Sequence, residues 1–340
     1  MNRIEYEHGS RPKQGETMAM ADGITWLRMP LPFILNHINL WLLRDDNGWV
    51  IVDTGIDTRA SRDIWEATFT TAMGSDPATH VIATHLHPDH AGCAGWLVQR
   101  FGIDLWMTRE EYMLCRVLVN DTGPEVPEEA VCFYRAAGHT DEQLEMYKQS
   151  FGMFGRVVGE LPQSYKRMQD EERLSFAGHE WEIIVGRGHS PEHACLYDRE
   201  RNILISGDQI LPTISPNVSV WPTEPQANPL KDWFESIDRL EAELPEDVLV
   251  LPAHGKPFRG AHVRLKQLRE DHADRLDKLV ETASEPRRAV DVFTTLFNST
   301  INDGNRVMAT GEAIAHLAYL CSTGDMVVEN NDGVMFFRRA

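Results

Sequence analysis

A dense group of histidine and aspartate side chains follows an apolar, strand-like run in the first third of the chain. The segment THLHPDHAG places His85, His87, Asp89 and His90 within six residues, directly after the run VIA. Two histidines at i and i+2 leave a strand end on one side, and imidazole and carboxylate groups suit Zn²⁺. The spacing therefore predicts metal ligation, with Asp89 and His90 reaching a second ion. The alternative is a polar loop without a metal.

Three further polar residues each end an apolar run. His189 follows WEIIVGRG, Asp208 follows NILISG, and His254 follows VLVLPA. Loops just past buried strands commonly carry functional groups, and the first group alone cannot fill the coordination spheres of two ions. We therefore expect these three residues to complete a dinuclear site. Asp53 ends the run VIVD, and we expect it to accept a hydrogen bond from a ligand imidazole.

Strand-like runs and helical patterns alternate up to about residue 258, which predicts a layered α/β core. Residues 109–172 have helical spacing, interrupted by TGPEVP, and are interpreted as a helical insertion. After this core come a long charged helix, further helical patterns and a hairpin with the turn NNDG. We therefore divide the chain into a catalytic domain, 1–262, and a C-terminal, winged-helix-like region, 263–340.

The motifs VIVDTG, HLHPDH, GHS, SGD and PAHG, in this order, resemble those of the metallo-β-lactamase-fold hydrolases over about residues 20–260. The resemblance implies a four-layer αββα sandwich with the metals at one edge, between two sheets. It also implies how the ligands divide between two ions: His85, His87 and His189 on the first, Asp89, His90 and His254 on the second, and Asp208 on both.

The implied activity is that of a dinuclear zinc-dependent hydrolase, with iron or manganese as alternative metals. Water activated by the ions would attack an ester, thioester or lactone of a small molecule, while Asp89 orients the water and receives a proton. Lactone-cleaving members of this superfamily often have a tyrosine just after the bridging aspartate, and DQILPTISPN has none. Two alternatives stay open on the same ligands, a metal-dependent ribonuclease or phosphodiesterase and an iron-dependent thiol oxygenase.

The charge balance argues against a nucleic-acid partner. The chain has 33 Lys+Arg and 52 Asp+Glu, a formal net charge of −19, which repels phosphate backbones and anionic membranes. Five scattered cysteines without a CxxC pattern favour a reducing cytoplasm. The first residues lack the apolar segment of a signal peptide, and no run is long enough to span a membrane. We expect a cytoplasmic enzyme with a small-molecule substrate, and a homodimer is an open alternative.

Two groups of side chains leave alternatives open. Aromatic and methionine residues of the insertion either line an apolar pocket for an acyl chain or pack in a local core or dimer interface; they are Tyr112, Met113, Phe133, Tyr134, Tyr147, Phe151, Met153 and Phe154. Five histidines lack ligand spacing and are expected at the surface: His139, His179, His262, His272 and His316. We expect His37 to be a hydrogen-bonded core residue and His193 to have a local structural role.

Overall fold

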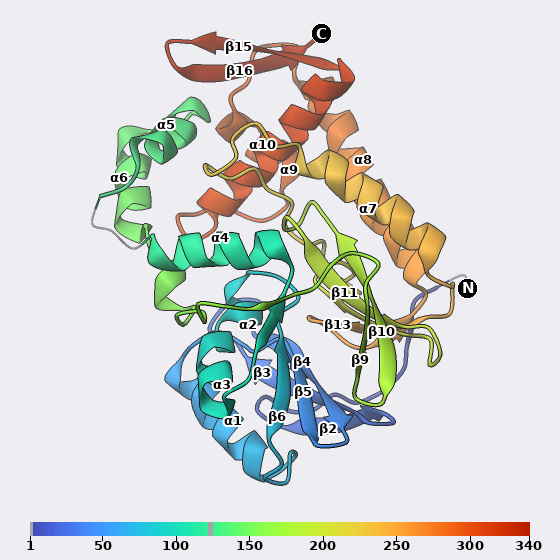
Figure 1. Ribbon diagram of the computed structural model, residues 1–340. Coiled ribbons are helices and arrows are strands. Elements are labelled where there is room, and N and C mark those ends of the chain that lie inside the picture. Colours follow the sequence, from blue (N-terminus) through green and yellow to red (C-terminus); the bar gives the residue numbers. More distant parts are fainter. Residues whose placement is uncertain (1–2, 122–124) are drawn as a thin grey trace.

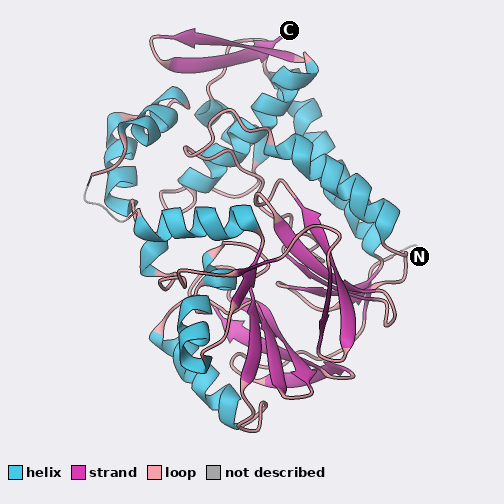
Figure 2. Cartoon of the chain, in the orientation of Figure 1, coloured by secondary structure: helices cyan, strands magenta, loops and turns pink. Residues whose placement is uncertain are grey.

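The computed structural model describes residues 3–121 and 125–340, and it shows two seven-stranded sheets packed face to face. Helices α1 (Arg59–Thr70) and α3 (Ala94–Phe101) cover the outer face of one sheet. Helices α7 (Pro229–Glu243) and α8 (Ala261–Thr282) cover the outer face of the other (Figures 1 and 2). This arrangement confirms the αββα sandwich that the sequence predicts.

The first sheet has an antiparallel half and a parallel half. Its strands, in spatial order, are β2 (Thr17–Ala21), β3 (Ile24–Pro30), β4 (His37–Asp45), β5 (Gly48–Val52), β6 (Ala78–Ile82), β7 (Leu105–Met107) and β8 (Lys166–Arg167). The segment DDNG forms the hairpin turn between β4 and β5, where Asp45 pairs with Gly48. The strands from β5 to β8 run parallel, and helices α1 and α3 form crossovers between them.

The second sheet is mainly antiparallel. Its strands, in spatial order, are β1 (Glu5–Tyr6), β14 (Phe258–Arg259), β13 (Leu249–Pro252), β12 (Ile203–Gly207), β11 (His193–Asp198), β10 (His179–Gly186) and β9 (Arg173–Phe176). Only β12 and β13 are parallel among the described pairs of this sheet, and helix α7 connects them. As a result, β10, β12 and β13 point the same way and end at one edge of the sheet.

The sheets pack through large aromatic side chains. Trp26, Trp41 and Trp181 are fully buried between the two sheets. Every residue of β5, β11, β12 and β13 is buried, because another layer covers each face of these strands. Strands β5, β12 and β13 therefore appear in the sequence as mainly apolar runs, without the alternation of a half-exposed sheet.

The insertion predicted over 109–172 is helical up to Arg156, whereas its last part contributes strand β8 to the first sheet. It contains α4 (Arg109–Asn120), α5 (Glu128–Ala136), α6 (Asp141–Ser150) and the 3₁₀ turn η1 (Phe154–Arg156). Residues 122–124, part of the predicted TGPEVP interruption, lie outside the described residues. Phe133 and Tyr147 pack around Tyr134, and Tyr112 stacks on Tyr165. These aromatic side chains therefore pack in cores of the protein, whereas Met113 and Met153 are exposed.

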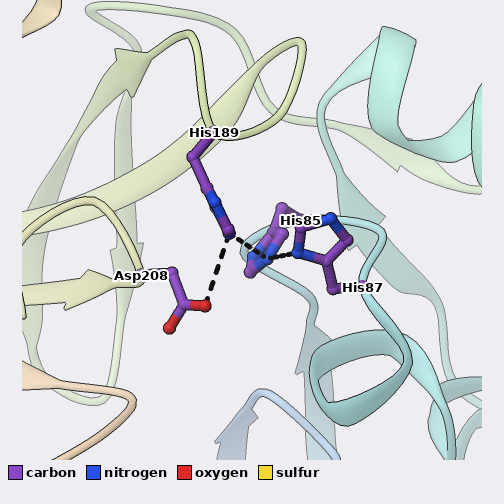
Figure 3. A group of neighbouring side chains, drawn as sticks. All are labelled: His85, His87, His189 and Asp208. Atoms are coloured by element: carbon purple, nitrogen blue, oxygen red, sulfur yellow. Dashed lines mark hydrogen bonds and ion pairs between the residues drawn. The ribbon is translucent and has the colours of Figure 1, made fainter. Parts of the chain in front are cut away.

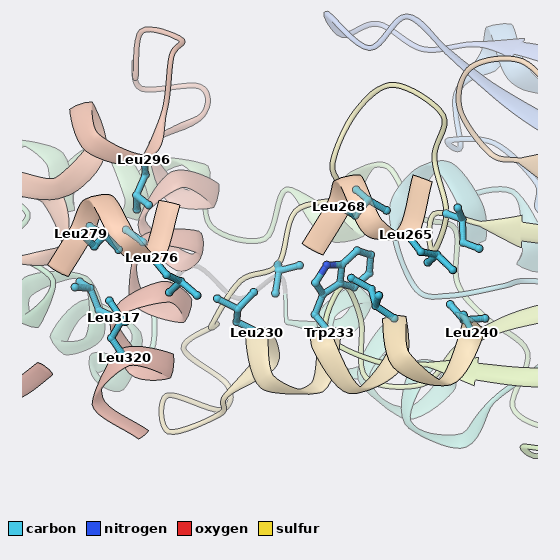
Figure 4. Close-up of a cluster of buried hydrophobic side chains, with 14 of the residues drawn as sticks. Leu230, Trp233, Leu240, Leu265, Leu268, Leu276, Leu279, Leu296, Leu317 and Leu320 are labelled. Carbon is cyan, nitrogen blue, oxygen red and sulfur yellow. The ribbon is translucent and has the colours of Figure 1, made fainter. Parts of the chain in front are cut away.

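The C-terminal region consists of helices followed by a hairpin. Beyond α8 lie η2 (Ala289–Val292), α9 (Phe293–Leu296), α10 (Arg306–Thr323), β15 (Met326–Asn331) and β16 (Val334–Arg339). The predicted NNDG turn joins the two strands, and the Gly333 N–H donates to Asn330 Oδ1 at 2.9 Å. Leucines of α8 and α10 form one continuous core with α7 and the second sheet (Figure 4). No helix in the described residues is long and apolar enough to cross a membrane.

Three histidines expected at the surface are buried, so this prediction was wrong for them. His272 and His316 are fully buried between α8 and α10, with His272 Nδ1 and His316 Nε2 3.1 Å apart. His139 is buried as well, and its Nε2 lies 2.9 Å from Thr310 Oγ1. The lack of ligand spacing suggested exposure, but the faces of α8 and α10 that carry His272 and His316 pack inward, and His139 is buried in the loop between α5 and α6.

We expect Trp233→Ala to destabilise the protein by about 3–5 kcal/mol, because it removes the largest side chain between α7 and α8 and leaves a cavity. Trp233 is fully buried in the core drawn in Figure 4. Urea unfolding followed by circular dichroism measures the effect. Val328→Ala, a control on the exposed hairpin, should change stability by less than about 0.5 kcal/mol. An equal loss in both variants would contradict this account of the core.

Candidate metal centre

The predicted ligand side chains all come from loops at one edge of the sandwich. Four loops or short helices supply them, following β6, β10, β12 and β13. Helix α2 (Pro88–Ala91) belongs to the first of these segments. Because the four strands end at the same edge, residues far apart in the sequence meet there. The structure brings together all seven side chains, in two neighbouring groups: His85, His87, His189 and Asp208, and Asp89, His90 and His254.

The first group has the spacing of ligands around one ion. His85 Nε2 lies 2.8 Å from His87 Nδ1 and 3.3 Å from His189 Nε2. Asp208 Oδ2 lies 3.4 Å from His189 Nε2 (Figure 3). Donor atoms bound at about 2.0–2.2 Å in a tetrahedral zinc site stand about 3.3–3.6 Å apart, which matches the two separations from His189, whereas His85 and His87 lie closer together. Three imidazoles and a carboxylate oxygen thus point into a space of the right size.

The second group faces the other oxygen of Asp208. His254 Nε2 lies 3.3 Å from Asp89 Oδ2 and 3.4 Å from Asp208 Oδ1. His90 Nε2 lies 3.6 Å from Asp208 Oδ1 and 3.9 Å from Asp89 Oδ2. The carboxylate of Asp208 therefore has one oxygen toward each group, which is the position of a bridging ligand.

The donor atoms fit a cation better than they fit one another. His90 Nε2 and Asp208 Oδ1 are buried and make no hydrogen bond within the described part of the protein. Buried polar atoms without partners are rare and costly in folded proteins. Two imidazole nitrogens also face each other across 3.3 Å, at His85 and His189. A divalent cation in each group would satisfy these lone pairs, so the residues present fit metal ions.

Hydrogen bonds on the outer side orient three of the imidazoles. The Nδ1–H of His189 donates to the carbonyl oxygen of Asn217 at 2.7 Å, and that of His254 donates to the carbonyl oxygen of His37 at 2.8 Å. The Nδ1–H of His90 donates to Asp53 Oδ2 at 2.8 Å. Each bond fixes the tautomer that leaves Nε2 free to face the centre.

The VIVDTG motif supports the HPDH turn through both side chain and backbone. Asp53 is buried, and the Thr84 N–H also donates to its Oδ1 at 2.8 Å. The next two backbone N–H groups, of Thr54 and Gly55, donate to the carbonyl oxygens of His90 and Asp89, both at 2.9 Å. Asp53 has φ +61°, a strained conformation for a residue other than glycine. This backbone turn aims its carboxylate at His90.

Sequence comparison agrees with this geometry. The pattern described as Metallo-beta-lactamase superfamily matches residues 34–254, well over half of the chain. The chain belongs to the metallo-beta-lactamase superfamily. A second pattern, described as the metallo-beta-lactamase-like C-terminal domain, matches residues 276–340. The C-terminal region is thus an appendage seen in this superfamily, and its likeness to a winged helix is not confirmed.

One solved structure that is similar to this member of the metallo-beta-lactamase superfamily has almost the same length. A beta-lactamase domain protein from Burkholderia ambifaria is 38% identical, with a TM-score of 0.91 over 99% of this chain and 98% of its own. A probable metallo-hydrolase from Bacillus subtilis is 22% identical over 86% of this chain and 91% of its own length. An acyl-coenzyme A thioesterase from Bos taurus is 23% identical, over 56% of this chain and only 65% of its own length. The chain thus spans about two thirds of the length of this thioesterase, and both of these curated relatives are named as hydrolases.

Glu111 is a supporting residue that sequence reasoning missed. It lies in the first turn of α4 and is fully buried. Its carboxylate accepts the N–H of Leu86, between His85 and His87, at 2.9 Å and the N–H of Glu192 at 2.8 Å. Burial raises the pKa of Glu111 to about 6. Glutamate is common in first helical turns. The sequence position of Glu111 therefore did not indicate that its carboxylate would connect the two ligand loops.

Asp208 is held by a close packing of Gly207 against His193. The backbone N–H of Asp208 donates to His193 Nε2 at 3.0 Å. Gly207 has φ +49°, and a Cβ at this position would collide with the His193 ring. His193 therefore has the structural role that the sequence suggested, and it acts on Asp208, the carboxylate that lies between the two groups.

We expect Gly207→Ala to reduce metal binding, because the added methyl pushes the His193 ring away from Asp208. Metal content per chain, measured by plasma mass spectrometry after dialysis, should fall below that of the parent protein. Gly178→Ala is the matched control: Gly178 has φ +71°, but a Cβ there meets no atom within 4 Å. Equal metal content in the two variants would contradict the proposed packing constraint.

The two groups differ in proton affinity. Burial, together with neighbouring His189, lowers the pKa of His87 to about 3. Burial alone would also lower the pKa of His90, but the carboxylates of Asp53, Asp208 and Asp89 hold it well above the usual value. In the metal-free protein, His85 and His87 of the first group are therefore neutral imidazoles, and His90 of the second group is an imidazolium.

In metal-free protein at pH 7 we expect His87 to be neutral and His90 to be protonated. A group with a raised pKa stabilises the fold below its unfolded value of about 6.5, and this contribution is lost as the pH rises through the folded value. ¹⁵N NMR of histidine-labelled protein, titrated from pH 5 to 9, measures both rings. A His90 ring that loses its proton below pH 6.5 would contradict the prediction.

Proposed function

We propose that the protein is a dinuclear metal-dependent hydrolase, with zinc as the metal, that cleaves an ester bond of a small molecule, most readily a thioester. One observation carries the dinuclear part. The two oxygens of Asp208 lie 3.4 Å from ligand nitrogens of different groups, His189 Nε2 and His254 Nε2. A single ion would leave one set of buried donors unpaired.

The seven residues His85, His87, Asp89, His90, His189, Asp208 and His254 would hold the two ions. Such ions, when bound, polarise the substrate carbonyl and lower the pKa of water toward about 7. The protein itself aims the imidazoles of His189, His254 and His90 inward, through their outer hydrogen bonds to Asn217, His37 and Asp53.

Asp89 is the carboxylate best placed to act on the water. Its side chain is 19% exposed, compared with 11% for Asp208 and 1% for Asp53. Burial opposes its ionisation, but His90 and His254 hold the pKa of Asp89 at about 2. Asp89 is therefore a carboxylate at neutral pH, and its exposed part is free to accept a hydrogen bond from a water that enters the centre. We propose that it orients the water and takes up the proton released during attack.

Two observations favour a thioester of a small molecule as substrate. The bovine relative is an acyl-coenzyme A thioesterase, although the match spans 65% of its length. The net charge of −19 repels polyanions such as RNA, which disfavours the ribonuclease alternative. Lactone cleavage has less support because no tyrosine follows Asp208 in the sequence. Cytoplasmic location and a homodimer remain predictions.

Purified protein should contain about two metal ions per chain, and their removal with dipicolinate should abolish thioester cleavage. His87→Ala should lower kcat/KM by at least about 100-fold, because it removes a donor of the first group. Addition of zinc should restore thioester cleavage by the chelated parent protein. Release of free thiol from acyl-coenzyme A and acyl-glutathione measures the activity. His8→Ala, which changes a partly exposed histidine outside the centre, is the matched control.

Different outcomes of the same experiment separate the alternatives. Full thioester cleavage by metal-free protein would contradict the proposal. Cleavage of a phosphodiester but of no thioester or lactone would favour the phosphodiesterase. Oxygen consumption on a thiol by the iron-loaded protein, without hydrolysis, would favour the thiol oxygenase.

A further inference from the structure

The loop that follows Asp208 lies against the helices of the C-terminal region. Its residues 211–221 are contacted at several points by α8 and α10. Arg264, on α8, donates to the carbonyl oxygens of Leu211 at 2.6 Å and Ile214 at 2.8 Å. The Val220 N–H donates to the carbonyl oxygen of Gly311, on α10, at 3.1 Å. The loop therefore depends on the C-terminal helices for its backbone conformation.

Contact between α10 and this loop is close enough to require glycine. A Cβ on Gly311 would lie 2.7 Å from the carbonyl oxygen of Val220 and 2.8 Å from Ser219 Cβ. Ser219 Oγ also donates to the carbonyl oxygen of Met308 at 3.3 Å. The helix backbone and the loop backbone thus touch directly, so displacement of α10 displaces the loop.

Asn217 connects this contact to the metal centre. Its carbonyl oxygen accepts the Nδ1–H of His189. Its side-chain Nδ2 donates to Glu312 Oε2, on α10, at 3.0 Å, and its Oδ1 accepts from Ser219 Oγ at 2.6 Å. Every polar atom of the Asn217 side chain therefore has a partner that restricts its rotation.

Glu312 is held in turn by an ion pair with α8. Arg275 Nη1 donates to Glu312 Oε1 at 2.9 Å, and the Glu312 side chain is only 12% exposed. A carboxylate between two fixed donors has little rotational freedom, and hydrogen bonds to charged groups are roughly twice as strong as neutral ones. The chain of contacts runs from Arg275 through Glu312 and Asn217 to His189.

We infer that Glu312, held by Arg275, is a positioning residue for His189, and that the C-terminal region thereby completes the metal centre. The inference rests on the proposed function, because it takes His189 as a metal ligand. Glu312 touches neither substrate nor metal. It fixes Asn217, whose carbonyl oxygen sets the orientation of the His189 ring. Changes in the partners behind metal-bound histidines typically alter metal affinity by about 10- to 100-fold.

A reciprocal exchange of the amide group of Asn217 and the carboxylate group of Glu312 tests the inference. Asn217→Asp places a carboxylate against Glu312 and should weaken zinc binding about 10-fold, and Glu312→Gln alone, which loses the charge, should weaken it by a similar factor. In the double variant, the amide introduced on α10 can donate to the carboxylate introduced on the loop, so the affinity should return to within about threefold of the parent. Zinc affinity of the metal-free full-length chain is measured by competition with a chromophoric chelator.

Two further measurements separate positioning from folding stability. The visible spectrum of the Co²⁺-loaded protein should change in both single variants and revert in the double variant, because it reports the geometry around the ion. The unfolding midpoint of each variant shows whether a loss of affinity merely follows a loss of stability. Glu329→Gln, which breaks an exposed ion pair with Arg338 on the hairpin, is the control and should leave affinity and spectrum unchanged.

The outcomes keep the two proposals apart. If both single variants have the same zinc affinity and the same Co²⁺ spectrum as the parent protein, the positioning role is overturned. The hydrolase proposal then stays intact. A double variant no better than the single variants would also overturn the positioning role, and if Asn217→Asp does not fold, Glu312→Gln decides alone. A parent protein that binds no zinc or cobalt would instead overturn the proposed function itself.

Discussion

The carboxylate of Asp208 is the point on which the rest of the site depends. It lies between two groups of imidazoles with one oxygen toward each. A buried carboxylate surrounded by lone pairs is costly unless cations are present. The surrounding structure holds this unfavourable cluster in place: Gly207 and His193 fix the Asp208 backbone, and outer hydrogen bonds turn the imidazoles inward. The free energy of folding thus offsets the cost of holding these donor atoms together before metal binding.

The ligand positions could be predicted because they depend on local signals. Each candidate ligand follows an apolar run, and apolar runs buried on both faces are strands of a covered sheet. His189, Asp208 and His254 could therefore be placed at strand ends without knowledge of the tertiary structure. The same reasoning placed Asp53 beside a ligand histidine, where its Oδ2 meets His90. Strand direction then brings these ends to one edge.

The supporting residues could not be predicted in this way, because their partners are defined only by tertiary packing. Glu111 contacts the backbone of Leu86 and Glu192, which lie 25 and 81 positions away. Glu312 contacts Asn217 across 95 positions. An acidic residue on a charged helix looks the same whether it faces solvent or a buried loop. The burial of His272 and His316 was missed for the same reason, since these two histidines meet each other across 44 positions and lack any local ligand spacing.

The two acids that brace the ligand loops come from the parts of the chain added to the sandwich. Glu111 lies on α4 of the insertion and Glu312 on α10 of the C-terminal region. These parts also contact each other, because the Val290 N–H donates to the carbonyl oxygen of Ala137 and His139 lies against Thr310. The apolar core drawn in Figure 4 runs without interruption from the second sheet into α8 and α10. A boundary near residue 262 therefore separates sequence patterns, but the energy that orders the metal centre comes from both sides of it.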